Sequence, residues 1–171
     1  MSIEIGVDSY VTAAQATEYI ESWYTAQDEK KAAWEGLSAA DREACLRRAA
    51  TAMERLRYTG VKKDFRQALS FPRTFTKNGW ADEAYVVLHS VDAQGVPKDV
   101  CHAQIEEALE LASPGESTEQ SRIRKGAVKS YSVGHLSESY SVAAASEAAA
   151  LCSQRAYELL LPYVGGGFDV R

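Results

Sequence analysis

The chain has 171 residues, of which 46% are hydrophobic and 25% charged, and its 19 Lys and Arg residues against 24 Asp and Glu residues give a net charge of -5. This length and composition predict one globular domain over residues 1–171. They argue against a membrane-spanning chain and against a protein with an overall basic field. The N-terminus lacks the basic and apolar regions of a secretory signal, which predicts a protein made in the cytoplasm.

Helical patterns dominate the first third of the chain. Thr12 and Gln15 fit a capping box, and the apolar residues that follow at three- and four-residue spacing form one stripe on a helix of about four turns. A short helical turn carries Trp34. Ser38 and Asp41 then begin a second main helix, because both side chains suit a helix N-terminus.

Two further helices are expected in the second half. Val96-Pro97 opens one of them, since proline is tolerated in the first turn, and it continues to Ala112. The last runs from about Val142 to Leu161, where Pro162 stops it. We therefore expect an all-α fold, a small bundle of about four main helices.

Three segments lie outside these helices. The stretch from residue 60 to 96 is broken by Gly and Pro residues and is expected to be a long central loop, the kind of segment that often carries function. Residues 116–141 are expected to form a protruding arm, a β-hairpin turning near Gly134, which would lean on another chain. Residues 163–171 follow as a glycine-rich flexible tail.

Within the central loop, Phe71-Pro72-Arg73 raises a choice between a DNA contact, a catalytic arginine and a structural corner. Pro72 favours an extended conformation at Phe71, which can then point inward while Arg73 points outward or reaches a nearby carboxylate or carbonyl. Because the chain is acidic overall, we interpret these three residues as a structural loop pin.

No motif indicates catalysis. The sequence lacks a nucleophile elbow, a P-loop, a metalloprotease helix and a dinucleotide fingerprint, so we predict no enzyme, no catalytic residue, no metal and no cofactor. The one close pair of zinc-type ligands, Cys101-His102, has side chains about 100 degrees apart on a helix. The cysteines are expected to be reduced, mostly buried thiols: Cys45, Cys101 and Cys152.

Two charged clusters leave alternatives open. Glu106, Glu107 and Glu110 are expected to face solvent, with the lining of a ring-shaped channel as the alternative. The best local basic patch has Tyr131 nearby, and it is interpreted as a partner-binding arm or, alternatively, as a single-strand binding element. Its cations are Arg122, Arg124, Lys125 and Lys129.

An ordered series of landmarks carries a family resemblance. They are Ser9 to Thr12, Trp23, Trp34, Leu69 to Arg73, Val96-Pro97, Val133 to Ser137 with Tyr140, and Leu160 to Tyr163. The series resembles the head-to-tail connector proteins (adaptor or head completion proteins) of tailed bacteriophages, some relatives of which are labelled DnaT-like single-stranded DNA-binding.

The resemblance implies a structural virion protein of the phage neck, made in the host bacterial cytoplasm and associated with DNA packaging. About twelve copies would form a ring under the portal protein, extend the channel for passing double-stranded DNA, and dock a stopper or tail-completion protein, with no membrane contact. The portal would be met by Tyr163, Phe168, Asp169, Val170 and Arg171. Neighbouring subunits or the tail would be met by Arg122, Arg124, Lys125, Tyr131, Val133, Leu136 and Tyr140.

The alternative function is a DnaT-like single-stranded DNA-binding module in phage replication. Such a module needs a continuous basic groove with several stacking aromatic side chains. A chain of net charge -5 with one small basic patch favours the connector.

Overall fold

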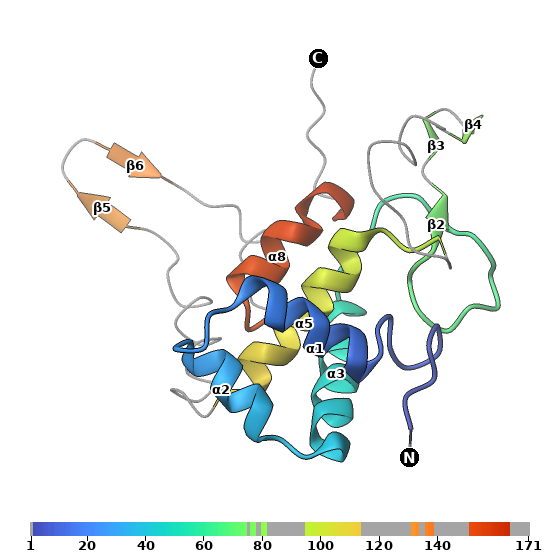
Figure 1. Cartoon of the computed structure of the whole chain (residues 1–171). Helices are drawn as coiled ribbons and strands as arrows, with labels where there is room; N and C mark the ends of the chain where they lie inside the picture. Colours follow the sequence, from blue (N-terminus) through green and yellow to red (C-terminus); the bar gives the residue numbers. More distant parts are fainter. Residues whose placement is uncertain are drawn as a thin grey trace.

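The computed structural model describes residues 2–74, 76–77, 80–81, 95–113, 131–133, 136–138 and 151–164. These residues form five α-helices (Figure 1): α1 (Ala13–Trp23), α2 (Glu29–Gly36), α3 (Ala39–Met53), α5 (Lys98–Ala112) and α8 (Gln154–Leu160), the last continued by the 3-10 turn η1 (Leu161–Tyr163). The protein is therefore mainly helical, as predicted, and the expected turn around Trp34 is a complete helix.

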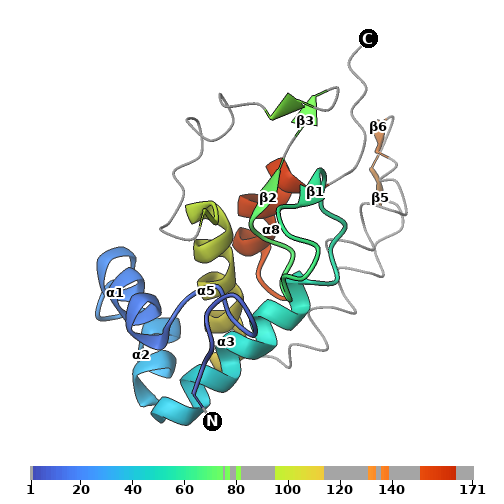
Figure 2. The ribbon, with the colours of Figure 1, turned by 90° about the vertical axis from the view of Figure 1, so that its right-hand side faces the viewer.

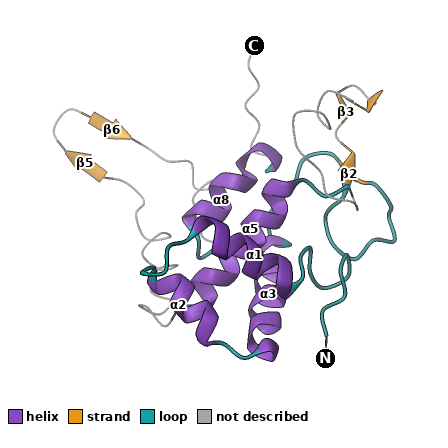
Figure 3. Ribbon diagram, in the orientation of Figure 1, coloured by secondary structure: helices purple, strands orange, loops and turns teal. Residues whose placement is uncertain are grey.

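Three short antiparallel strand pairs accompany the helices (Figure 3). They are β1 (Val61–Lys62) with β2 (Arg73–Thr74), β3 (Thr76–Lys77) with β4 (Trp80–Ala81), and β5 (Tyr131–Val133) with β6 (Leu136–Glu138). In the last pair Val133 lies opposite Leu136, which confirms the predicted hairpin turning near Gly134.

Helix α5 is the centre of the bundle. It contacts α1, α2, α3 and α8, and its residues from Val100 to Leu109 are buried except for His102. A helix covered on nearly all sides must lie inside the molecule. Figures 1 and 2 show α5 between the other helices, with the strands β1 and β2 at one end of the bundle.

Side chains at the helix starts explain where four of the helices begin. The predicted capping box is present, with the Thr12 hydroxyl accepting from the Gln15 N–H and the Gln15 side chain accepting from the Thr12 N–H. Asp28, Ser38 and Ser153 cap α2, α3 and α8 in the same way. Each cap pairs a backbone N–H group that the helix itself leaves unsatisfied.

The last helix is shorter than predicted. Residues 151–153 are not helical and α8 begins at Gln154, so the expected continuous helix from Val142 to Leu161 is wrong. The cause is Glu107 of α5, whose carboxylate accepts hydrogen bonds from the backbone N–H groups of Cys152 and Ser153 at 2.8–2.9 Å. These bonds hold the chain extended just before the Ser153 cap.

The expectation that the acidic cluster of α5 faces solvent is also wrong for two of its three residues. Glu106 is 1% exposed and Glu107 is fully buried. Glu110, by contrast, is partly exposed, with its carboxylate 2.6 Å from the Lys30 ammonium group. Buried carboxylates need donors nearby, and here other helices supply them.

Other predictions can be placed directly. The three cysteines are reduced and buried, as expected. No described helix is long and apolar enough to cross a membrane. Tyr163 is buried, whereas the other residues expected to meet a portal, Phe168 to Arg171, lie outside the described residues, as do Arg122, Arg124, Lys125 and Tyr140 of the arm.

Candidate nucleic-acid interface

Positive charge is concentrated in one stretch of the chain. Residues 42–73 carry nine of the 19 Lys and Arg residues but only three of the 24 Asp and Glu residues. The end of this stretch, residues 55–66, is called the basic loop below. It carries one acidic residue, Asp64, and five cations, all at least partly accessible to solvent: Arg55, Arg57, Lys62, Lys63 and Arg66.

Phe65 projects from the basic loop into solvent. Its side chain is 85% exposed, more than any other large hydrophobic side chain described. The guanidinium carbon of Arg66 lies 5.2 Å from the centre of the phenyl ring, in a cation–π contact. An aromatic ring is therefore held at the surface beside a cation.

Hydrogen bonds within the loop fix the turn that presents Phe65. The Asp64 carboxylate accepts from the Arg66 N–H at 2.9 Å, and the Asp64 N–H donates to the Gln67 side chain at 3.1 Å. The Gln67 amide donates in turn to the carbonyls of Leu69 and Pro72, and the Lys62 ammonium group donates to the carbonyls of Gln67 and Ala68. The loop is thus ordered before any ligand arrives.

Arg73 ties the two sides of the loop together. Its guanidinium donates to four backbone carbonyls, those of Tyr58, Thr59, Gly60 and Ser70, at 2.6–3.3 Å. Burial lowers the pKa of Arg73, with the nearby Glu54 carboxylate opposing that effect. Because its donors are occupied by the protein's own carbonyls, Arg73 offers little to a phosphate.

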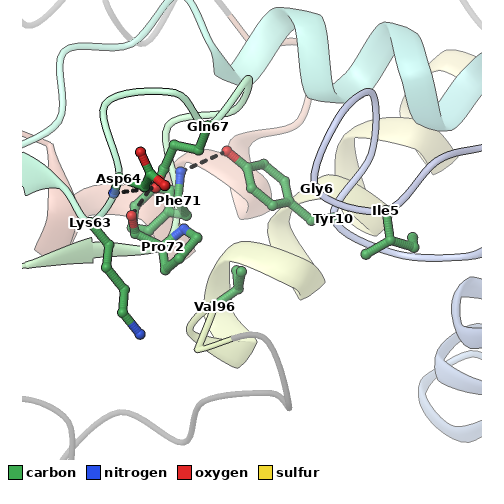
Figure 4. A pocket seen from close by; sticks show the side chains of 9 residues that line it. All are labelled: Ile5, Gly6, Tyr10, Lys63, Asp64, Gln67, Phe71, Pro72 and Val96. Atoms are coloured by element: carbon green, nitrogen blue, oxygen red, sulfur yellow. Dashed lines mark hydrogen bonds between the residues drawn. The ribbon is translucent and has the colours of Figure 1, made fainter.

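Phe71 anchors the loop to the bundle from inside. It is 1% exposed and makes edge-to-face ring contacts with Tyr10, Tyr58 and Tyr163. Its backbone N–H donates to the Tyr10 hydroxyl at 3.2 Å (Figure 4), and the following peptide bond to Pro72 is cis. The three residues of the predicted pin therefore lie together at the base of the loop.

Glu54 links this anchor to the end of α3. Its carboxylate accepts from the Tyr10 hydroxyl at 2.6 Å and from both the N–H and the hydroxyl of Ser70 at 3.0 and 2.7 Å. Burial, with Glu54 next in effect, raises the pKa of Tyr10 well above its usual value, so that its hydroxyl stays a donor at any physiological pH.

The 3-10 turn η1 after α8 holds the start of the basic loop. The Thr59 N–H and hydroxyl both donate to the Tyr163 carbonyl, at 2.8 and 3.1 Å, and Tyr58 forms an antiparallel bridge with Val164. The basic loop is thereby fixed to a segment 104 residues further along the chain.

A hollow of about 460 Å³ lies between the basic loop and the N-terminal segment (Figure 4). Its walls include Ile5, Tyr10, Lys63, Phe71 and Val96, and it is mostly apolar with the Lys63 side chain extending outward at its edge. This volume falls within the range of small-molecule sites in proteins, about 300–1,000 Å³. A flat ring such as a nucleobase would fit it.

The described residues offer no comparable site for a metal. No group of three His, Cys, Asp or Glu side chains that could hold an ion occurs among them. His102 packs on Tyr19 with ring centroids 4.6 Å apart, and burial lowers the pKa of its imidazole. This histidine is therefore largely neutral at pH 7.

The basic patch predicted from the sequence is not the one that the described residues show. Sequence reasoning singled out residues 122–129, which lie outside the described residues, and it overlooked Lys63, Phe65 and Arg66. The uneven distribution of charge over residues 42–73 is the signal that would have found them.

Comparison with known proteins decides the family. A family model described as "putative DnaT-like ssDNA binding protein" matches residues 2–171. The chain belongs to this family. No curated protein and no solved structure gave a significant match.

Assignment to the head-to-tail connector family was therefore wrong, since the matching family is the DnaT-like one over nearly the full chain. The landmarks used for it are caps, prolines and buried aromatic residues, such as Thr12, Pro97 and Phe71, which report helix ends and a core rather than one family. The ring of copies, the portal and tail partners and the place in the virion were inferred from that resemblance and lose its support.

Proposed function

We propose that the protein binds single-stranded DNA without sequence preference, and that the basic loop is the contact surface. The observation that carries the proposal is Phe65, whose ring stands 85% exposed beside Arg66 on a loop that carries five cations. Proteins that hold single strands combine cations along the sugar-phosphate backbone with aromatic rings on which bases stack. The family description points in the same direction.

The geometry favours an unpaired strand over a duplex. A base can stack on Phe65 only if its own face is free, and in a duplex the neighbouring base pairs cover that face. Arg66 already lies over the phenyl ring at 5.2 Å. The side chains of Arg55, Arg57 and Lys63 are exposed on the same loop, so they are suited to phosphate contacts.

The order of the loop lowers the cost of binding. The side chains of Arg73 and Gln67 fix its backbone by donating hydrogen bonds to six backbone carbonyl groups of the loop and its base. A surface that is already ordered loses less conformational entropy when a ligand binds. The rest of the chain is acidic overall, which favours first contact of a phosphate backbone with the basic loop.

The test is binding of a fluorescently labelled oligothymidine, followed by anisotropy at several salt concentrations. We expect Phe65→Ala to weaken binding by about 1–3 kcal/mol, the value of one stacked base. Lys63→Gln and Arg66→Gln should each lower the slope of log affinity against log salt by about 0.7, the effect of one lost phosphate contact on a single strand.

Two controls accompany this test. Lys30→Gln removes one positive charge on α2, where Lys30 pairs with Glu110, and should leave the salt slope unchanged. Phe65→Trp keeps an aromatic ring and should keep affinity. Absence of binding by the unaltered protein at low salt, or equal affinity of Phe65→Ala, would refute the proposal.

A further inference from the structure

A second aromatic surface lies at the end of α1, on the other side of Tyr10 from the basic loop. Trp23, the last residue of α1, is 61% exposed at the edge of a hollow of about 410 Å³. The hollow is formed by one face of α1 and the first turns of α5, and its walls include Tyr19, Lys98 and His102. The basic loop does not contribute to it.

The Trp23 ring is held in place by a buried network. It stacks on Tyr19 with ring centroids 5.8 Å apart, and the guanidinium carbon of Arg155 lies 5.7 Å from its centre. Arg155 is half exposed and is positioned by Glu106, whose carboxylate lies 3.2 Å from the arginine Nε. The same carboxylate accepts from the hydroxyls of Tyr19 and Tyr24.

This network explains why a carboxylate is buried in α5 at that position. Burial is the largest single effect and lowers the pKa of Arg155, but the Glu106 carboxylate together with Tyr19 and Tyr24 raises it overall, so that Arg155 stays charged. Glu106 is 1% exposed, and its carboxylate is paired with Arg155 and two tyrosine hydroxyls. Glu106 thus holds a cation beside an exposed indole, as Asp64 and its neighbours do for Arg66 beside Phe65.

The two hollows adjoin the same residue, Tyr10. Tyr10 lines both, and Val96 of the first hollow is two residues before Lys98 of the second. A strand that ran from the basic loop past Lys98, at the start of α5, to Trp23 would have cations and aromatic rings along its path. Successive stacking rings along a path with cations are the arrangement that single-strand binding requires.

We infer that the Trp23 hollow is a second base-stacking site for the same DNA strand, with Lys98 and Arg155 as its cations. This inference rests on the proposed function, because it assumes that a strand is bound at Phe65. A base would stack on the exposed part of the Trp23 indole. Only a strand long enough to span both sites would use it.

Tryptophan fluorescence tests the contact directly. Of the three tryptophans, Trp34 is fully buried, with its indole N–H donated to Thr17, and cannot meet a base. In a Trp80→Phe background the exposed emission comes from Trp23. We expect a long oligothymidine to quench this emission. Trp23→Phe should abolish the quenching, whereas Phe65→Ala should retain the quenching when DNA is saturating.

The length of the DNA separates the two sites. With oligothymidines of roughly 4 to 16 nucleotides, the span of known single-strand modules, Phe65→Ala should weaken binding at every length. Trp23→Leu should weaken binding about tenfold for the longest and have no effect on the shortest, because the shortest reach one site only. Thermal unfolding should be nearly unchanged in Trp23→Leu, whose replaced side chain is largely in solvent.

The outcomes are distinguishable. If the unaltered protein binds no oligothymidine, the proposed function fails. If binding depends on Phe65 while Trp23 is neither quenched nor needed at any length, the second site is refuted and the proposed function stands. An equal loss in Trp23→Leu at all lengths would also refute a second site on a shared strand.

Discussion

The helical core and the basic loop handle charge in opposite ways. In the core, Glu106 and Glu107 are buried and their negative charges are satisfied by tyrosine hydroxyls, Arg155 and backbone N–H groups. In the basic loop the cations stay in solvent, and no Lys or Arg among the described residues is buried. A net charge of -5 therefore overstates how negative a surface an approaching phosphate meets.

The buried carboxylate gives the largest expected effect. Glu107→Gln replaces one acceptor oxygen by an NH₂ group that faces the N–H groups of Cys152 and Ser153. Leaving a buried donor unpaired costs about 1–3 kcal/mol, so we expect the free energy of unfolding in urea to fall by about 2 kcal/mol. Glu110→Gln, on the partly exposed side of α5, is the matched control and should cost no more than about 1 kcal/mol.

The pH dependence of Glu107 sharpens the same test. Burial raises the pKa of this carboxyl above its ordinary value of 4.5, although its backbone hydrogen bonds oppose that effect. The folded protein then holds more protons than the unfolded chain between the two pKa values, so this carboxyl's contribution to stability falls as pH rises through that window. Glu107→Gln should lack that contribution. A pH profile identical in both proteins would contradict the raised pKa.

Arg73 tests the link between the two regions. Arg73→Ala removes the donors for the carbonyls of Tyr58, Thr59, Gly60 and Ser70, and we expect unfolding free energy to fall by about 1–2 kcal/mol and DNA affinity to fall with it. Arg73→Lys keeps the charge but cannot supply the planar set of donors. Full recovery of stability in Arg73→Lys would show that charge, and not the pin, is what matters.

Substitution of Asp64 is expected to have the smallest effect, and that effect is on DNA affinity. Asp64→Asn keeps an oxygen that can accept from the Arg66 N–H, so the turn is preserved while the loop's one negative charge is removed. We expect affinity for oligothymidine to rise about threefold at low salt, as one surface repulsion disappears. The gain should vanish at high salt, where exposed charges are screened. An unchanged affinity at low salt would show that the DNA phosphates do not bind near Asp64.

Local signals in the sequence predicted the local structure well. The capping box at Thr12, the buried cysteines and the turn near Gly134 each depend on a few neighbouring residues, and all three were foreseen. The mainly helical fold follows from such signals.

What sequence reasoning missed depends on distant partners. Glu107 looked like a surface residue because nothing near it in the sequence reveals its hydrogen-bond donors. These are the N–H groups of Cys152 and Ser153, more than forty positions away, and they make burial of the carboxylate possible. Phe65 was overlooked for a similar reason. Its exposure depends on a loop held by Arg73 and Tyr163, and a one-dimensional pattern does not show which aromatic residue of such a loop points outward.

The two hydrogen bonds from Thr59 to the Tyr163 carbonyl have a consequence for the order in which the molecule matures. During synthesis the ribosome makes the basic loop early, but Tyr163 emerges about a hundred residues later, so a nascent chain carries the cations and Phe65 without their fixed arrangement. The surface proposed to hold DNA takes its final form only when the last helix has folded. Under the proposed function, we expect growing chains to bind the strand more weakly than the finished protein does.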